Sequence, residues 1–247
     1  MTETESTPDP NEGGIVFSRI ARLHQLELTP RREQLRRLAA ANRLIIDRMV
    51  STGSSATVEQ LAEAAAGLER LAAELESLPA GKEYEGFSEV ANSGPIPSDD
   101  DPERWALFDH SPFIGLSNPL SPPIDMNFLE DRVVATVTFG AAYEGPPGCV
   151  HGGYVAAAFD ELLGCAQSLS GTQGMTAQLV VNYRTPTPLG QELHLEGRLV
   201  RREGRKIYTS GKLMVGDRLC AEAEGLFIMF DSARFQALLA ARMDQIG

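Results

Sequence analysis

A glycine-rich segment followed by an acidic residue supplies the groups of this sequence that could do chemistry. The segment reads Gly148-Cys-Val-His151-Gly152-Gly153, and Asp160 follows two turns into a predicted helix. Backbone N–H groups at the start of a helix, helped by the helix dipole, can stabilise a developing oxyanion, and glycine lets a carbonyl group come close. A carboxylate in an apolar helix is costly to bury unless it has a partner or a function. Together the two features indicate chemistry at a carbonyl group.

The helix that carries these groups is predicted from Gly152 to Leu169. It is apolar around most of its circumference, so it must be buried on several sides. Asp160 and Glu161 lie about 100° apart around a helix, so the two cannot point into one cleft equally well. We take Asp160 as the reactive carboxylate, and Glu161 as its alternative or as a substrate contact.

Alternating and β-branched runs predict a sheet around this helix. The predicted strands are 132–139, 178–183, 192–202, 205–215 and 218–230. The turn signals Glu203-Gly204 and Gly216-Asp217 make the connections short, which favours antiparallel pairing. One buried helix wrapped by a bent antiparallel sheet is the arrangement of the hotdog fold, in the α+β class.

The N-terminal region has a different pattern. Apolar residues at helical spacing predict helices over about 30–50 and from the capping box Thr57-x-x-Gln60 onward. They form a helical hairpin within 19–79, which is either a packed hairpin with solvated charges or an arm that binds a partner. The remaining predicted boundaries are a disordered tail (1–18), a linker (80–104), the hotdog domain (105–232) and a C-terminal helical tail (233–247).

Two motifs resemble those of the PaaI-type and THEM-type acyl-CoA thioesterases. The first is His151-Gly-Gly-x-x-Ala-x-x-x-Asp160, and the second runs from Met175-Thr176 to Pro188-Leu189. The resemblance covers about half of the chain and implies a hotdog fold, hydrolysis of an acyl-CoA thioester and a dimer as the smallest active unit. It also implies that the Gly152 N–H holds the thioester oxygen, that Asp160 is general base or nucleophile, and that Thr176 positions the attacking water.

The spacing of the two catalytic groups has a consequence of its own. Eight residues separate Gly152 from Asp160, which is about 12 Å along a helix, too far for both to touch one thioester carbon. We therefore expect each site to use groups from two subunits of a homodimer. Whether such dimers pair further into tetramers is left open. His151 is expected to orient the loop as a neutral imidazole, because the positive end of a helix disfavours its charged form.

Further residues are expected to contact substrate. Gly153 lies beside the oxyanion amide, and Arg184 is the cation of the second motif that we assign to the CoA phosphates. Asn118 either hydrogen-bonds the thioester or fixes a turn before Pro119. No metal or redox cofactor is expected, since CoA is part of the substrate. The acyl-chain preference is left open.

Composition narrows the possible partners. The 247 residues carry 34 acidic and 22 basic side chains, a net charge of −12, which disfavours nucleic acid and anionic membranes as partners.

Three scattered cysteines and the lack of a leader-like N-terminus predict a cytoplasmic protein. Motifs of serine hydrolases of the α/β type, nucleotide enzymes and zinc enzymes are missing. Two alternatives remain: a non-catalytic acyl-CoA-binding or regulatory protein, and an enoyl-CoA hydratase or dehydratase.

Overall fold

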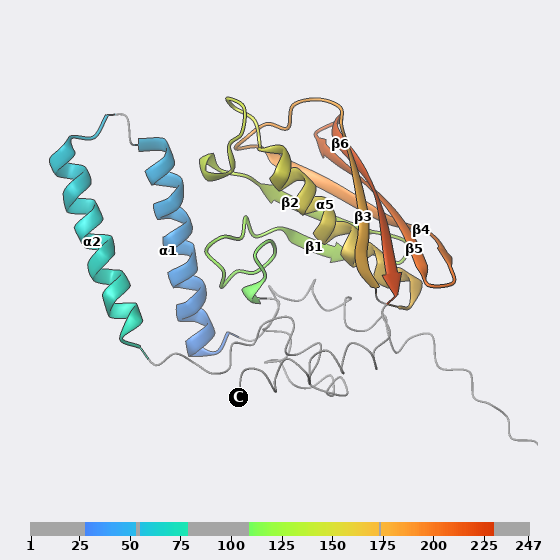
Figure 1. Cartoon of the computed structure of the whole chain (residues 1–247), viewed down its shortest axis with the longest axis horizontal. Coiled ribbons are helices and arrows are strands. Elements are labelled where there is room, and N and C mark those ends of the chain that lie inside the picture. The colour runs from blue at the N-terminus through green and yellow to red at the C-terminus, as the bar shows by residue number, and fades with distance from the viewer. Residues whose placement is uncertain (1–27, 53–54, 79–108, 173, 230–247) are drawn as a thin grey trace, which may run out of the picture.

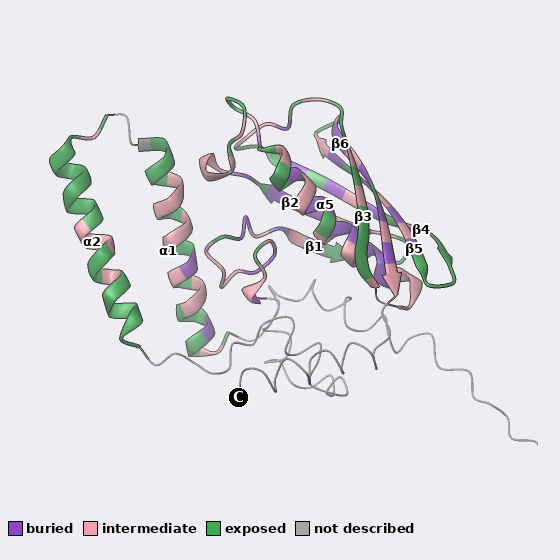
Figure 2. Ribbon diagram, viewed as in Figure 1, coloured by how far each residue is buried: buried purple, intermediate pink, exposed green. Residues whose placement is uncertain are grey.

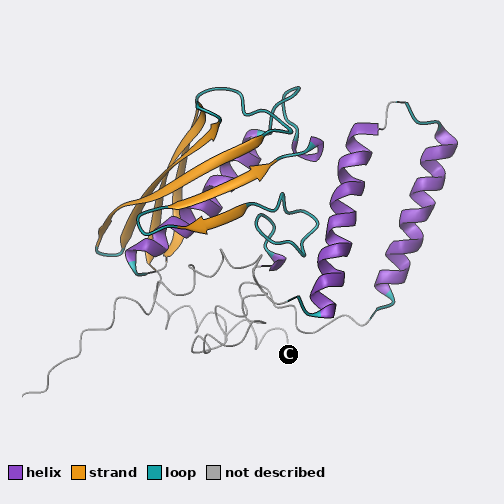
Figure 3. Cartoon of the chain, turned by 180° about the vertical axis from the view of Figure 1, so that it is seen from behind, coloured by secondary structure: helices purple, strands orange, loops and turns teal. Residues whose placement is uncertain are grey.

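The computed structural model describes residues 28–52, 55–78, 109–172 and 174–229. Within these residues, six strands form one antiparallel sheet in the order β1-β2-β4-β5-β6-β3, with helix α5 against it (Figures 1 and 3). The strands are β1 (Asp125–Phe128), β2 (Val133–Thr138), β3 (Gly174–Tyr183), β4 (Glu192–Glu203), β5 (Lys206–Val215) and β6 (Arg218–Met229). This confirms the predicted hotdog fold.

The central helix α5 (Gly152–Ala166) continues into the short 3-10 helix η4 (Gln167–Ser170), close to the predicted limits. Leu162 and Leu163 are fully buried, and each contributes about 2 kcal/mol of hydrophobic stabilisation. Two glycines of the sheet leave room for these leucines. A Cβ on Gly197 of β4 would lie 2.9 Å from Leu162 Cγ, and a Cβ on Gly211 of β5 would lie 3.1 Å from Leu163 Cδ2. The helix can therefore approach the sheet closely.

Strand β3 is the long edge of the sheet. It pairs with β6 on one side only, and most of its side chains are exposed (Figure 2). Met175, Val180 and Tyr183 are among its exposed apolar or aromatic residues. A long unpaired edge with apolar side chains is a template for pairing with another strand.

Helix α1 (Pro30–Thr52) packs against the hotdog domain through charged side chains. Arg36 forms a salt bridge of 2.9 Å with Asp109, whose side chain is 1% exposed. Arg43 Nη1 donates to two carbonyls of the 109–124 loop, at 3.1 and 2.7 Å. These contacts turn Arg36 and Arg43 toward the hotdog domain, where the Asp109 carboxylate and two backbone carbonyls face them.

Helix α2 (Val58–Glu76) runs beside α1 in the opposite direction (Figures 1 and 3). Its predicted capping box is confirmed, since Thr57 accepts from the Gln60 N–H and the Gln60 side chain accepts from the Thr57 N–H. Of the two alternatives left open for this hairpin, the packed one gains no support from α2, which contains no buried residue and exposes Leu61 and Leu75.

The predicted tail (1–18), linker (80–104) and C-terminal helix (233–247) lie outside the described residues, so those boundaries stay predictions. Among the helices that the structure describes, none is long and apolar enough to cross a membrane.

Candidate active site

The start of α5 leaves one backbone amide available. His151 is the N-cap, and its Nδ1 accepts from the Gly153 N–H at 3.0 Å. The N–H groups of Tyr154 and Val155 both donate to the His151 carbonyl, at 2.9 and 3.3 Å. No described residue accepts a hydrogen bond from the Gly152 N–H. The N–H groups of the first three helical residues lack i−4 partners within the helix. Of these three, only the Gly152 N–H has no acceptor among the described residues and is available to a ligand.

The same contacts hold His151 in place. Its Nδ1 faces the Gly153 N–H at 3.0 Å, so the imidazole lies against the backbone of the loop that it caps. The loop-orienting role of His151 stays a prediction. Gly153 is engaged by His151 and does not point an amide at substrate; a Cβ on Gly153 would lie 3.1 Å from His151 Nδ1.

Tyr183 covers the start of the helix and was not singled out from the sequence. Its hydroxyl donates to the Gly152 carbonyl at 2.8 Å. Its ring carbons lie 3.4 and 3.5 Å from where a Cβ of Gly152 would stand. The residue is part of the second motif, but the sequence does not show which face of β3 it occupies or that β3 passes the helix start.

Asp160 and Thr176 meet at the edge of the sheet. Thr176 Oγ1 donates to Asp160 Oδ1 at 2.9 Å, and both residues are exposed. Because α5 is unbroken from Gly152 through Asp160, the helix rise places them about 12 Å apart. The structure thus brings together Asp160 and Thr176, and it does not bring either to Gly152 of the same chain.

Glu161 points elsewhere. It is partly buried, and its carboxyl faces Ser111 of the 109–124 loop. Burial, and next the charge of Asp160, raise its pKa from 4.5 to about 7, in spite of the opposing effect of Ser111. Glu161 is therefore close to half-protonated near neutral pH and does not share the exposed position of Asp160.

The two remaining predicted contacts are already engaged within the chain. The Arg184 guanidinium forms an ion pair with Glu222, which offsets part of the charge that a CoA phosphate would meet. The Asn118 amide donates to the His110 carbonyl and accepts from the Leu120 N–H, each at 2.9 Å. These contacts are those of a turn-fixing residue, one of the two roles left open for Asn118.

The described residues include no group of three His, Cys, Asp or Glu side chains placed to hold a metal ion. Cys149, Cys165 and Cys220 are free thiols. Burial raises the pKa of the Cys165 thiol, which makes it unreactive.

A buried helix with a glycine start, wrapped by one antiparallel sheet, defines a hotdog protein. Residues 147–222 match the thioesterase superfamily. The chain is 35% identical to protein RHA08564, a thioesterase superfamily protein of known crystal structure, over 78% of this chain and 94% of that one, with a TM-score of 0.66. The chain therefore belongs to the thioesterase superfamily.

Curated relatives include the acyl-coenzyme A thioesterase THEM4 of Xenopus laevis. It is 38% identical over 104 residues, which cover 41% of this chain and 47% of that protein. THEM4 of Bos taurus is also 38% identical over 104 residues, covering 41% of this chain and 43% of the relative. The match thus spans about half the length of these curated relatives.

Proposed function

We propose that this chain hydrolyses an acyl-CoA thioester to a carboxylic acid and free CoA, at sites formed across a homodimer. The observation that supports it most is the amide of Gly152, which lacks an acceptor among the described residues at the positive end of α5. An N–H aimed at the thioester oxygen stabilises the tetrahedral intermediate, and one such donor is typically worth about 10²–10³ in kcat.

Asp160 is the group proposed to drive attack on the thioester carbon. As general base, it takes a proton from water while the water oxygen bonds to the carbon; the C–S bond then breaks and the CoA sulfur leaves with a proton. As nucleophile, its carboxylate bonds to the thioester carbon while the C–S bond breaks and CoA leaves as the thiolate; water then opens the mixed anhydride, which releases the acid and restores the Asp160 carboxylate. In both routes Thr176 holds the carboxylate through the 2.9 Å hydrogen bond.

The dimer is proposed because each chain alone has two half-sites. The Gly152 amide and Asp160 lie about 12 Å apart along α5, so a complete site needs a second copy. The exposed edge strand β3 offers the surface for it. Pairing β3 with its twofold-related copy would extend the sheet, cover Met175 and Val180, and place two α5 helices antiparallel.

Two finer assignments complete the proposal. Arg184 is assigned to the CoA phosphates, since it stands in β3's continuation and can exchange Glu222 for a phosphate oxygen. The three free thiols favour a reducing compartment such as the cytoplasm.

The test is release of free CoA from a panel of acyl-CoAs, followed with a thiol-trapping reagent. Wild type is expected to turn over at least one thioester, and Asp160→Asn to lose nearly all of that rate. The matched control is Asp217→Asn, which makes the same change at an exposed turn between β5 and β6. Release at only the background rate by both wild type and Asp160→Asn would refute the enzymatic reading, whereas full activity in Asp160→Asn would move the reactive role to Glu161. Binding without turnover in wild type would favour a non-catalytic acyl-CoA-binding protein.

A further inference from the structure

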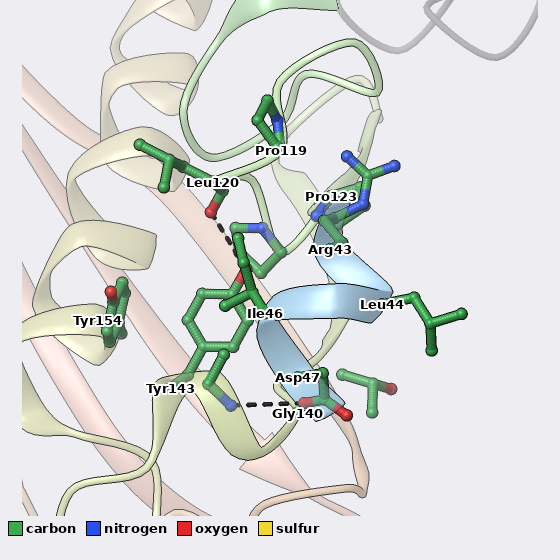
Figure 4. Close-up of a pocket in the computed structure, with 13 residues that line it drawn as sticks. Arg43, Leu44, Ile46, Asp47, Pro119, Leu120, Pro123, Gly140, Tyr143 and Tyr154 are labelled. Atoms are coloured by element: carbon green, nitrogen blue, oxygen red, sulfur yellow. Dashed lines mark hydrogen bonds between the residues drawn. The ribbon is translucent and has the colours of Figure 1, made fainter. Parts of the chain in front are cut away.

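A pocket of about 300 Å³ lies where α1 meets the start of α5 (Figure 4). One wall comes from α1, a second from the 109–124 loop, and a third from η3 (Ala141–Tyr143) and the first turn of α5. Its volume is at the lower end of the roughly 300–1,000 Å³ typical of small-molecule sites. The residues that matter most here are Arg43, Ile46, Asp47, Leu120, Tyr143 and Tyr154.

Three polar side chains in these walls, those of Arg43, Asp47 and Tyr143, have hydrogen-bond partners within the protein. Arg43 donates to two carbonyls of the 109–124 loop, and Asp47 Oδ1 accepts from a backbone N–H of η3 at 3.4 Å. The Tyr143 hydroxyl donates to the Leu120 carbonyl at 3.1 Å, and burial raises the pKa of Tyr143 to about 12, so the ring stays uncharged. The surface left for a ligand comes from aliphatic, proline and aromatic side chains. Such a surface fits a hydrocarbon group and not a charged one.

The pocket adjoins the oxyanion amide through Tyr154. This residue stands two positions after Gly152 on the first turn of α5. Its ring packs edge-on against Tyr143, with centroids 4.8 Å apart, and against His151, with centroids 6.4 Å apart. One aromatic side chain therefore borders both the pocket and the loop that presents the Gly152 amide.

We propose that this pocket holds the distal part of an apolar acyl group, so that α1 helps to set the acyl-chain preference. This rests on the proposed function, because the thioester carbonyl must lie at Gly152 for the chain to pass Tyr154 and enter. A short acyl group such as acetyl ends before the pocket and gains nothing from it. A medium-length acyl chain reaches the pocket, where it leaves water and contacts Ile46 and Leu120, and this burial favours its binding.

The experiment fills the pocket from two independent walls. Ile46→Trp acts from α1 and Leu120→Trp from the 109–124 loop, while Met49→Trp adds the same ring at an α1 position that is 62% exposed and does not line the pocket. For each variant, kcat/KM is measured for octanoyl-CoA and for acetyl-CoA. Both thioesters are also titrated calorimetrically against each variant in the slow Asp160→Asn background.

Both pocket variants should lower the octanoyl-to-acetyl ratio by at least about tenfold, since even one methylene is worth roughly that much in a fitted pocket. Acetyl-CoA turnover should stay near wild type, and Met49→Trp should leave the ratio unchanged. An unchanged ratio in either pocket variant, with a native circular dichroism spectrum, would overturn the assignment while leaving the hydrolase proposal intact. If wild type releases no CoA, the hydrolase proposal fails, and the titrations then decide the pocket by whether octanoyl preference is lost in the same two variants.

Discussion

The free energy of unfolding should depend on pH through one carboxyl group in particular, that of the partly buried Glu161. Its pKa is raised from 4.5 to about 7 in the folded chain, mainly by burial and then by the charge of Asp160. Below pH 4.5 the group is protonated in both states, so it costs nothing. Between 4.5 and about 7 the unfolded chain loses the proton and the folded chain keeps it, so the free energy of unfolding falls as pH rises.

The size of the effect follows from the same two values. At about 1.36 kcal/mol per pH unit, the gap between them amounts to a loss of about 3 kcal/mol that is complete above pH 7. Glu161→Gln keeps the shape and the hydrogen-bonding capacity of the protonated carboxyl and cannot ionise. The variant should therefore match wild type near pH 4.5 and be more stable by up to about 3 kcal/mol at about pH 8.

Urea unfolding of wild type and Glu161→Gln at both pH values provides the assay, and the difference between the two proteins removes the contribution of every other titrating group. Glu130→Gln, at an exposed position, is the matched control and should show no pH-dependent difference. A difference for Glu161→Gln that is the same at both pH values would refute the reasoning.

Three further perturbations test other contacts. Tyr183→Phe removes the hydroxyl that holds the first carbonyl of α5, and we expect CoA release to fall several-fold with a stability loss of only about 1 kcal/mol; unchanged kinetics would deny Tyr183 a positioning role. Arg36→Gln removes the charged partner of the buried Asp109, and urea unfolding should show a loss of about 3–5 kcal/mol, against less than about 1 kcal/mol for a dispensable surface pair. Val180→Lys puts a charge on the β3 edge, and light scattering should show fewer dimers than for wild type or for Val200→Lys on the interior strand β4; equal dimer content in all three would exclude β3 as the interface.

Much of the hotdog domain could be predicted because its helix and most of its strands have recognisable local sequence patterns. The predominantly apolar helix over 152–169 and the turns at Gly204 and Gly216, both with positive φ, required no knowledge of distant residues. Strand β1 was not predicted, since its four residues include one buried side chain and show no alternation.

The contacts that escaped prediction join residues far apart in sequence. Arg36 meets Asp109 across 73 positions, and Tyr183 meets Gly152 across 31. The helical pattern predicts the spacing of the arginines in α1. It does not predict that the buried Asp109 carboxylate forms a salt bridge with Arg36. Likewise the capping box of α2 is a local signal and was predicted, whereas the exposure of Leu61 and Leu75 depends on where the helix lies relative to α1.

The central claim is that the Gly152 amide of one subunit and Asp160 of the other make one site. Gly152→Pro tests the amide alone, because proline is tolerated at the first helical position and His151 already has the extended backbone that must precede it. Gly152→Ala is the matched control, since it keeps the N–H and its Cβ would stand 3.4 Å from Tyr183, an ordinary contact.

The most direct measurement is CoA release from mixtures of Gly152→Pro and Asp160→Asn chains, refolded together so that subunits exchange. Each variant alone should be slower than wild type by at least about 10²-fold, and Gly152→Ala should retain most of the activity. A mixture should recover activity, because the heterodimer contains one site with both groups intact. Failure of the mixture to exceed either variant, with heterodimers demonstrated by differential tagging, would contradict a site shared between subunits.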